Sequence, residues 1–360
     1  MHYSALMKRI FRSLFCVCLF LLILETGTRV LFSVKTINEV ITKGRNDATC
    51  RWEWLKTHEG GAQIYDSFKK YDPTKGWAVI PNVTNGPFVY HKIINSNSKG
   101  LRGKVEYQYV KDVNKLRILC IGDSFTFGDE VNDNETYPFY LQEMLPQAEV
   151  INMGVEGYGH DQVLIYLKEE GIKYKPDIII LGFKYIDSDR DMLEFYDYAK
   201  PRFKLINNKL KLCNSPVPSP EMTLIREPWR SRFIDLLNIV KVEVSYKDGS
   251  YKKEKDNLTN ALLKEIANTA KGIGAVPIIV DLDNLRDKDP ASNLTKSERA
   301  FFVKCSSVTA NCVFLRQNIL AARQLGVKIK EEGHFDAETN QLVASGIRNY
   351  LQKNGFLERQ

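Results

Sequence analysis

The sequence predicts an α/β domain built on a parallel sheet, preceded by an N-terminal membrane helix. From residue 116 onward, short and almost purely apolar runs alternate with amphipathic segments. Such runs are typical of parallel strands that helices cover on both faces. A separate apolar run at residues 13–24 follows a cluster of cations. With 44% hydrophobic and 26% charged residues, the composition is that of a globular chain.

The expected main domain spans residues 116–355. Its first strand lies in the first half of 116–128, and Asp161 is placed to cap the second of its helices. Residues 198–257 interrupt the alternation and are expected to be an insertion that could form a lid or a substrate wall. The other expected strands are 149–152, 176–182, 275–281 and 312–315, and the expected helices are 137–145, 161–170, 258–271, 318–325 and 337–351.

Residues 1–35 are interpreted as a membrane anchor or signal segment. Lys8, Arg9 and Arg12 precede the apolar run, which places the start of the chain inside and the body outside. The run is short for a span, which needs about 20 residues. No small-residue cleavage site follows it, so we favour an uncleaved single-pass anchor with an extracytoplasmic body. Secretion after signal cleavage is the alternative.

Residues 36–115 are expected to form a stalk, helical at first, and then a β-rich lead-in. Trp52 and Trp54 fit either a membrane interface or packing against the main domain. A turn-rich stretch runs from Tyr71 to about Gly103. We expect this lead-in to pack on the main domain and to border its cleft.

Charge and cysteine content limit the partners. The net charge is +7, without a basic stripe interleaved with aromatics, which argues against a nucleic-acid partner. In an exported body Cys305 and Cys312 could close a small loop, and unpaired thiols are the alternative. No Cys/His spacing indicates zinc, and nothing in the chain calls for a metal or an organic cofactor.

Two distant segments carry residues for nucleophilic catalysis. Ser124 follows Gly122 and Asp123 at the carboxyl end of the first strand, where open α/β sheets place ligand sites. A serine hydroxyl needs an adjacent base, and His334 lies in an acidic, glycine-containing loop before the last helix. The alternatives are a serine that caps the following helix and a histidine on a surface loop.

This arrangement resembles the GDSL or SGNH family of serine esterases and acyltransferases. The resemblance runs from about residue 117 to the C-terminus and rests on the early Gly-Asp-Ser turn and the late histidine. It implies a three-layer α/β/α flavodoxin-like fold, with Ser124 as nucleophile and His334 as general base. The family has aspartate three residues before the histidine, a position that Glu331 fills here. Glu332 is the second candidate, and a Ser–His dyad is the third possibility.

The resemblance also implies donors for a tetrahedral oxyanion. The backbone N–H groups of Ser124 and Gly154 fill two of the family's positions. Ile186 stands where the family has an asparagine side chain, and the loss of one such donor costs about 2.7–4 kcal/mol. The amide of Gln162 or the charge of Lys184 is a candidate replacement.

For five further acidic or basic residues we expect structural rather than chemical roles. Asp123 is expected to order the turn. The group Asp187, Asp189, Arg190 and Asp191 fits a solvated loop with local ion pairs better than a metal cluster or a charged cleft rim.

The sequence thus favours a membrane-anchored serine esterase that cleaves acyl esters. O-acetylated glycans and envelope components are candidate substrates. An O-acyltransferase would use the same residues. A non-catalytic binding or envelope-assembly protein on the same fold is the alternative from another class, because Ile186 and Glu331 depart from the family pattern.

Overall fold

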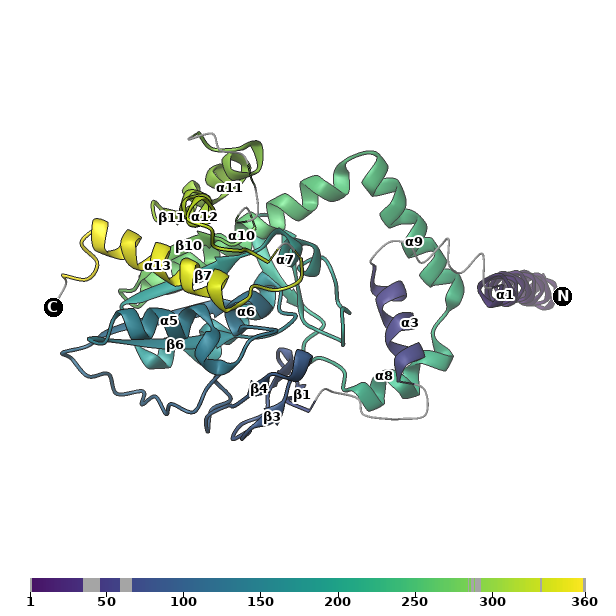
Figure 1. Ribbon diagram of the computed structural model, residues 1–360. Coiled ribbons are helices and arrows are strands. Elements are labelled where there is room, and N and C mark those ends of the chain that lie inside the picture. Colours follow the sequence, from purple (N-terminus) through teal and green to yellow (C-terminus); the bar gives the residue numbers. More distant parts are fainter. Residues whose placement is uncertain are drawn as a thin grey trace.

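A five-stranded parallel sheet forms the centre of the protein in the computed structural model, which describes residues 2–34, 46–58, 67–283, 285, 288, 293–330 and 332–358. The strand order is β11-β10-β7-β5-β6 (Figure 1). Every neighbouring pair is parallel, as their near-continuous apolar sequences predict. The strands are β5 (Leu116–Gly122), β6 (Ala148–Gly154), β7 (Ile178–Phe183), β10 (Val276–Asp281) and β11 (Cys312–Val313).

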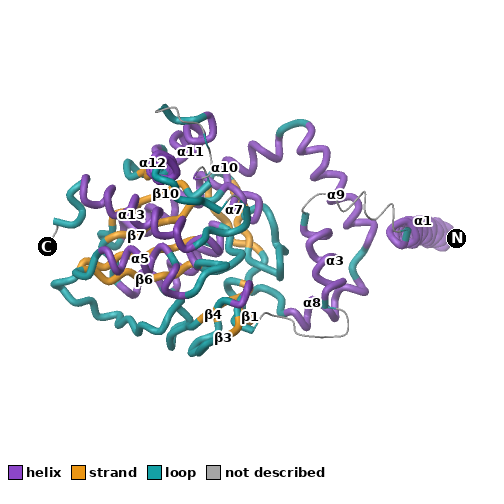
Figure 2. The backbone as a smooth tube through the Cα atoms, in the orientation of Figure 1, coloured by secondary structure: helices purple, strands orange, loops and turns teal. Residues whose placement is uncertain are grey.

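Helices cover both faces of this sheet and make the expected three layers (Figure 2). Alternate residues of β5 enter different cores, since Leu119 and Ile121 pack with one and Ile118 and Cys120 with the other. The first core takes side chains from α6 (His160–Glu169), α10 (Ser250–Gly272) and α11 (Lys296–Ser306). The second takes them from α5 (Tyr137–Met144), α12 (Arg316–Gln324) and α13 (Ala337–Lys353).

The strand order confirms the flavodoxin-like class. Taken in chain order, the strands read 2-1-3-4-5, so the direction of winding reverses at β5. Ligand sites in such sheets lie outside the carboxyl ends of the strands at this switch point. The residue stretch that follows β5 is the one that carries Ser124.

The segment before the sheet packs on the domain through two small hairpins. They are β1 (Lys69–Asp72) with β2 (Gly76–Val79), and β3 (Gly86–Pro87) with β4 (Ile93–Ile94). Trp77 of β2 is fully buried, and its Nε1–H donates to the Glu156 carbonyl at 2.9 Å. A short 3₁₀ turn, η1 (Val89–His91), connects the strands of the second hairpin.

The segment between α7 (Tyr185–Arg190) and β10 forms an arm beside the main body. It holds the hairpin β8 (Arg202–Ile206) and β9 (Lys209–Cys213), then α8 (Pro220–Arg226), η4 (Glu227–Trp229) and α9 (Arg232–Lys247). Helix α9 packs on α3 (Asp47–Thr57) and on α1 (His2–Ser33). The arm's helices α8 and α9 bond to α1 and α3, and the lid or substrate wall expected of residues 198–257 stays a prediction.

Buried ion pairs explain this placement. The Arg51 guanidinium of α3 donates to Glu227 at 2.6 Å and to Asp235 at 2.7 Å, and all three side chains are nearly fully buried. A buried cation needs such partners, so these ion pairs hold the arm against α3. Trp52 and Trp54 are buried in the same region, which corresponds to the packing alternative for these residues.

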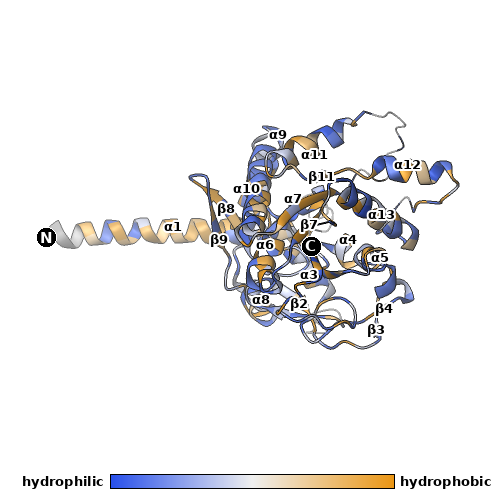
Figure 3. Cartoon of the chain, turned by 90° about the vertical axis from the view of Figure 1, so that its left-hand side faces the viewer, coloured by the Kyte–Doolittle hydropathy of each residue, from blue (hydrophilic) through white to orange (hydrophobic). Residues whose placement is uncertain are grey.

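Helix α1 extends from the body as a single apolar rod (Figure 3). Its stretch Leu6–Ser33 is long and apolar enough to cross a membrane, with a mean hydropathy of 2.0 in its most apolar window. It is longer than the expected run because Val30 and Phe32 continue the apolar character past Glu25 and Arg29. In the body, Cys305 and Cys312 form a disulfide.

Candidate active site

A tight turn after β5 presents the serine. Asp123 is the N-cap of α4 (Ser124–Phe127), and its Oδ1 accepts the Phe125 N–H at 3.0 Å. Gly122 is required because a Cβ there would lie 2.3 Å from Thr126 Oγ1. Ser124 therefore sits at the first residue of α4, at the carboxyl end of the sheet. Asp123 orders this turn, as the sequence predicted.

The structure brings Ser124 and His334 together. His334 Nε2 lies 2.9 Å from Ser124 Oγ, although 210 residues separate them. Helix α13 begins at Ala337 with Asp336 as its N-cap, which fixes the loop that carries the histidine. This distance allows the imidazole to accept the hydroxyl proton.

The carboxylate on the other ring nitrogen belongs to Glu130, which the sequence reasoning missed. Glu130 Oε1 lies 3.0 Å from His334 Nδ1. With Nδ1–H donating to Glu130, Nε2 is left to accept from Ser124, the tautomer that a general base requires. A carboxylate six residues after the serine, in a turn with Gly128, was the only sequence signal for it.

The backbone of Glu130 adopts an uncommon conformation to make this contact. Its φ is +67°, in the left-handed region that non-glycine residues rarely adopt. Across the contact, Gly333 has φ +72°, and a Cβ there would lie 3.1 Å from Glu130 Oε2. Burial raises the pKa of Glu130, but hydrogen bonds from Lys330 and His334 outweigh it and hold the pKa below its usual range. The Glu130 carboxylate is therefore charged at neutral pH.

The sequence predicted Glu331 or Glu332 as the carboxylate that orients His334. Glu331 lies outside the described residues. Glu332 is exposed, and the carboxylate that meets the imidazole is that of Glu130 instead.

A second carboxyl, Asp129, lies close to the histidine. Its Oδ2 is 3.8 Å from His334 Nε2, and its Oδ1 is buried without a hydrogen-bond partner among the described residues. Burial, followed by the charge of Glu156, raises the pKa of Asp129 well above its usual value, against the opposing charges of Lys69 and Arg102. A buried carboxyl group with a raised pKa thus stands beside the Ser124–His334 pair.

The structure uses Gly154 differently from the expected oxyanion donor. Its N–H donates to Asn152 Oδ1 at 3.0 Å, so this group is already satisfied. Asn152 Nδ2 in turn donates to the Phe127 carbonyl at 3.3 Å. A Cβ on Gly154 would lie 2.2 Å from the Phe127 nitrogen, so glycine lets the end of β6 touch α4. The Ser124 N–H, at the first turn of α4, has no acceptor among the described residues.

The two proposed replacement donors are also engaged elsewhere. Gln162 is buried in α6, and its Nε2 donates to the Lys75 carbonyl at 2.7 Å. Lys184 Nζ pairs with Asp283 Oδ1 at 2.9 Å and lies 4.1 Å from the Phe125 ring centroid. Ile186 is 41% exposed in α7.

The acidic group after β7 is buried rather than solvated, except for one member. Arg190 Nη1 donates to Asp187 Oδ1 at 2.7 Å and to Asp123 Oδ2 at 3.3 Å, directly behind the nucleophile turn. Asp191 Oδ2 lies 2.9 Å from His160 Nδ1, also in the interior. Only Asp189 is near the surface, where it pairs with Lys255. The solvated-loop interpretation was therefore wrong for Asp187, Arg190 and Asp191.

This buried network continues to Lys200, whose ammonium pairs with Asp161 and is fully buried with it. Asp161 is not the cap of α6, because the helix begins at His160 with Gly159 as its N-cap. Burial raises the pKa of Asp161 to about 6 despite the charge of Lys200. Among the described residues, no three His, Cys, Asp or Glu side chains are arranged to hold a metal ion.

Aromatic side chains surround the catalytic candidates. The Phe125 ring lies 4.8 Å from the His334 ring and 4.7 Å from Phe335, measured between centroids. From the lead-in, the exposed Tyr90 ring lies 5.7 Å from the Lys330 ammonium that pairs with Glu130. The lead-in therefore reaches the rim of the site.

No protein-family model matches the chain, and neither does any curated protein. The chain is similar in structure to TesA, at 12% identity and a TM-score of 0.40, over 66% of this chain and 98% of that one. It is similar to a member of the lipolytic G-D-S-L family from Veillonella parvula, at 11% identity and a TM-score of 0.39, over 66% and 99%. A third similar structure is Axe2, an acetylxylan esterase from Geobacillus stearothermophilus, at 12% identity and a TM-score of 0.39, over 67% and 96%.

Proposed function

We propose that the chain is a serine ester hydrolase in which Ser124 is the nucleophile, His334 the general base and Glu130 the orienting carboxylate. The observation that carries the proposal is the continuous chain of contacts from Ser124 Oγ to His334 Nε2 at 2.9 Å and from His334 Nδ1 to Glu130 Oε1 at 3.0 Å. A serine held by an oriented base is the general requirement for acyl transfer.

The reaction proceeds in two halves. His334 Nε2 takes the Ser124 proton as Oγ attacks the ester carbonyl, and Glu130 stabilises the imidazolium that forms. The proton then passes to the leaving alcohol and the acyl group stays on Oγ. Water attacks the acyl-enzyme while His334 takes one of its protons, and the return of that proton to Ser124 releases the acid.

The tetrahedral oxyanion has the Ser124 N–H as its backbone donor. The internal hydrogen bond of Gly154 and the apolar Ile186 leave the two other family positions without a free donor in this conformation. A missing donor costs about 2.7–4 kcal/mol, so we expect a slow hydrolase. The same observation favours the second candidate, a non-catalytic binding protein on this fold.

The body of the enzyme is held outside the cytoplasm by α1 in this proposal. Lys8, Arg9 and Arg12 at its start favour an inside N-terminus. The disulfide between Cys305 and Cys312 is consistent with an oxidising compartment. The alternative is secretion after cleavage, which the intact mass of the chain from membranes would reveal. Esters on glycans or envelope polymers remain the proposed substrates.

Fluorophosphonate labelling of the full chain in detergent tests the chemistry. We expect one labelled site, lost in Ser124→Ala and kept in Ser188→Ala, which removes another buried serine. An acetyl ester assay with and without a glycan acceptor then separates hydrolysis from acyl transfer. Absence of labelling in a folded chain would favour the non-catalytic protein.

A further inference from the structure

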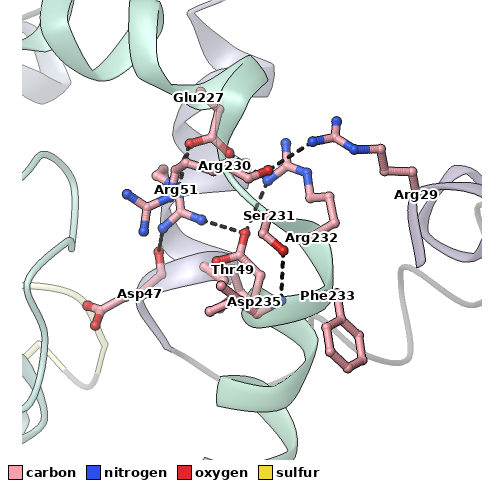
Figure 4. Close-up of polar contacts among 12 residues, drawn as sticks. Arg29, Asp47, Thr49, Arg51, Glu227, Arg230, Ser231, Arg232, Phe233 and Asp235 are labelled. Atoms are coloured by element: carbon pink, nitrogen blue, oxygen red, sulfur yellow. Dashed lines mark hydrogen bonds and ion pairs between the residues drawn. The ribbon is translucent and has the colours of Figure 1, made fainter. Parts of the chain in front are cut away.

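The end of α1 is bonded to the start of α9 (Figure 4). Glu25 accepts the backbone N–H groups of Arg232 at 3.0 Å and Phe233 at 3.1 Å, and the Ser231 hydroxyl at 2.7 Å. Arg29 donates to the Arg230 carbonyl at 2.9 Å. Helix α1 is thus not loosely tethered, because its polar side chains satisfy backbone groups at the N-terminus of α9.

Helix α9 has two unlike faces. One packs on α3 through Asp235 and Ile239, which are buried. The other leaves four apolar side chains between 50% and 58% exposed, spaced three or four residues apart: Ile234, Leu237, Val240 and Val244. Such spacing places them on one side of the helix. We call these four residues the apolar stripe.

Two further exposed apolar side chains come shortly before α9 in the sequence. Trp229 is 88% exposed, and Ile225 of α8 is 63% exposed. Tryptophan with an apolar neighbour is typical of membrane–water interfaces. Exposed apolar surface of this kind marks protein or membrane interaction sites.

The arrangement of α1 and α9 indicates which kind of partner covers the apolar stripe. Figure 1 views α1 nearly along its axis while α9 runs across the picture, and Figure 3 shows α1 from the side. Helix α9 therefore crosses the direction of α1. If α1 spans a bilayer, α9 lies along the bilayer surface at the point where α1 leaves it. Figure 3 also places the β8–β9 hairpin on the side of the body from which α1 extends.

Charge around the stripe suits a lipid surface. The exposed cations of the arm and the following corner outnumber the exposed carboxylates there. The cations are Arg226, Arg230, Lys241, Lys247, Lys252 and Lys253, and the carboxylates are Glu221, Glu243, Asp248 and Glu254. The hairpin adds exposed lysines at 204, 209 and 211. Juxtamembrane cations are attracted to the anionic lipids of a leaflet.

We propose that the apolar stripe and Trp229 lie in the interface of the bilayer that α1 crosses, and hold the catalytic body against the membrane surface. The occupant of the exposed face is lipid, not a second protein. The inference rests on the proposed anchoring by α1, and it adds a second, peripheral contact that fixes the orientation of the body.

Brominated phospholipids test the contact in the full chain. The chain is reconstituted into vesicles that contain a dibrominated lipid, and tryptophan quenching is compared between the wild type and Trp229→Phe. The other three tryptophans, Trp52, Trp54 and Trp77, are buried in protein. We expect a quenched, blue-shifted component that Trp229→Phe lacks. A Trp229 emission at the wavelength found in water, quenched by aqueous iodide instead, would overturn the inference.

A charge variant supplies the matched control. Leu237→Asp with Val244→Asp should remove Trp229 quenching, whereas Val303→Asp, at a 69% exposed site on α11, should not. Retention of the chain on vesicles after an alkaline carbonate wash is measured in parallel. Loss of retention would refute the anchor, while retention without Trp229 quenching would refute only the interfacial helix. Stripe-dependent cross-links between copies at high lipid dilution would identify a dimer surface and also overturn the inference.

Discussion

Glu130 and His334 meet at 3.0 Å across 204 residues of chain, and both sides of the contact use left-handed backbone. Glu130 itself has φ +67°, and Gly333, beside the histidine, has φ +72°. A left-handed conformation costs about 1–3 kcal/mol at a non-glycine residue and persists where the surroundings enforce it. The ion pair with Lys330 and the bond to His334 supply that enforcement.

Glu130→Gln should therefore reduce catalysis without unfolding the chain. The substitution keeps the size of the side chain but removes the charge that stabilises the imidazolium. We expect kcat/KM for a p-nitrophenyl ester to fall about 10³- to 10⁴-fold, as for the carboxylate of serine hydrolase triads. Steady-state kinetics and the rate of fluorophosphonate labelling measure the effect.

Glu332→Gln is the matched control, because Glu332 lies two residues from the histidine and is exposed. Its activity should stay within about twofold of the wild type, since a solvated carboxylate makes no fixed contact with the ring. The opposite pattern, with Glu332→Gln inactive and Glu130→Gln active, would assign the orienting role to the histidine loop.

Much of the fold could be predicted because its signal is local. Apolar runs in the sequence predict the strands. The glycine turn after β5 places Ser124 at the switch point of the sheet. His334 was identified by its position before an amphipathic helix. Burial patterns and turns of this kind depend on a few adjacent residues.

The missed features depend on contacts across the chain. Glu130 reaches the histidine only through its backbone conformation, which its sequence neighbours do not encode. Arg190 attracts Asp187 and Asp123 into the interior, whereas the local sequence looks like a solvated loop. The hydrogen bond between Gly154 and Asn152 likewise engages a donor that the family resemblance implied for the site.

Asp129 should make stability depend on pH. Burial raises its pKa in the folded state, so between the unfolded value, about 3.9, and the folded value the native chain binds more protons than the unfolded chain. The free energy of unfolding then decreases as pH rises through this window, by about 1.4 kcal/mol per unit of pH at most. Asp129→Asn has the shape of the protonated carboxyl group and does not titrate. Its free energy of unfolding should therefore decrease less with rising pH than that of the wild type.

Urea unfolding of both proteins in detergent, at intervals from pH 4.5 to 7.5, measures this difference. The advantage of Asp129→Asn over the wild type should grow with pH. Asp112→Asn, at an exposed position, controls for the general effect of removing a charge. Parallel pH profiles for Asp129→Asn and the wild type would show that Asp129 is ionised in the folded chain.

The buried Lys200–Asp161 pair should be costly to break from one side. Lys200→Met leaves a fully buried carboxylate without its cation, and removal of one partner of such a pair typically costs about 3–5 kcal/mol. We expect that loss in the free energy of unfolding. Lys204→Met is the control, because Lys204 pairs with Glu194 at 3.4 Å on the surface, where ion pairs contribute about 0–1 kcal/mol.

A double variant separates the charge from the packing. Lys200→Met with Asp161→Asn removes both charges, so it should recover part of the stability lost in Lys200→Met alone. The contrary outcome is a double variant whose loss in free energy of unfolding equals the sum of the losses in Lys200→Met and Asp161→Asn alone. The two side chains would then contribute independently, and the pair would not be coupled.

Gly154→Ala should damage the nucleophile turn specifically. The added methyl group would lie 2.2 Å from the Phe127 nitrogen and 2.6 Å from the Thr126 carbonyl carbon, both of them backbone atoms. Neither can move without shifting α4, and Ser124 begins that helix. We expect a loss of about 1–3 kcal/mol in stability, as for overpacked sites, together with slower fluorophosphonate labelling.

Gly272→Ala tests whether that effect comes from the contact rather than from the residue type. Gly272 is the last residue of α10, and nothing lies within 4 Å of a Cβ there. Alanine is the better helix former, so this variant should be as stable as the wild type or slightly more so, with unchanged labelling. If Gly154→Ala labelled at the wild-type rate, β6 and α4 could separate without moving Ser124, and the close approach at Gly154 would serve packing alone.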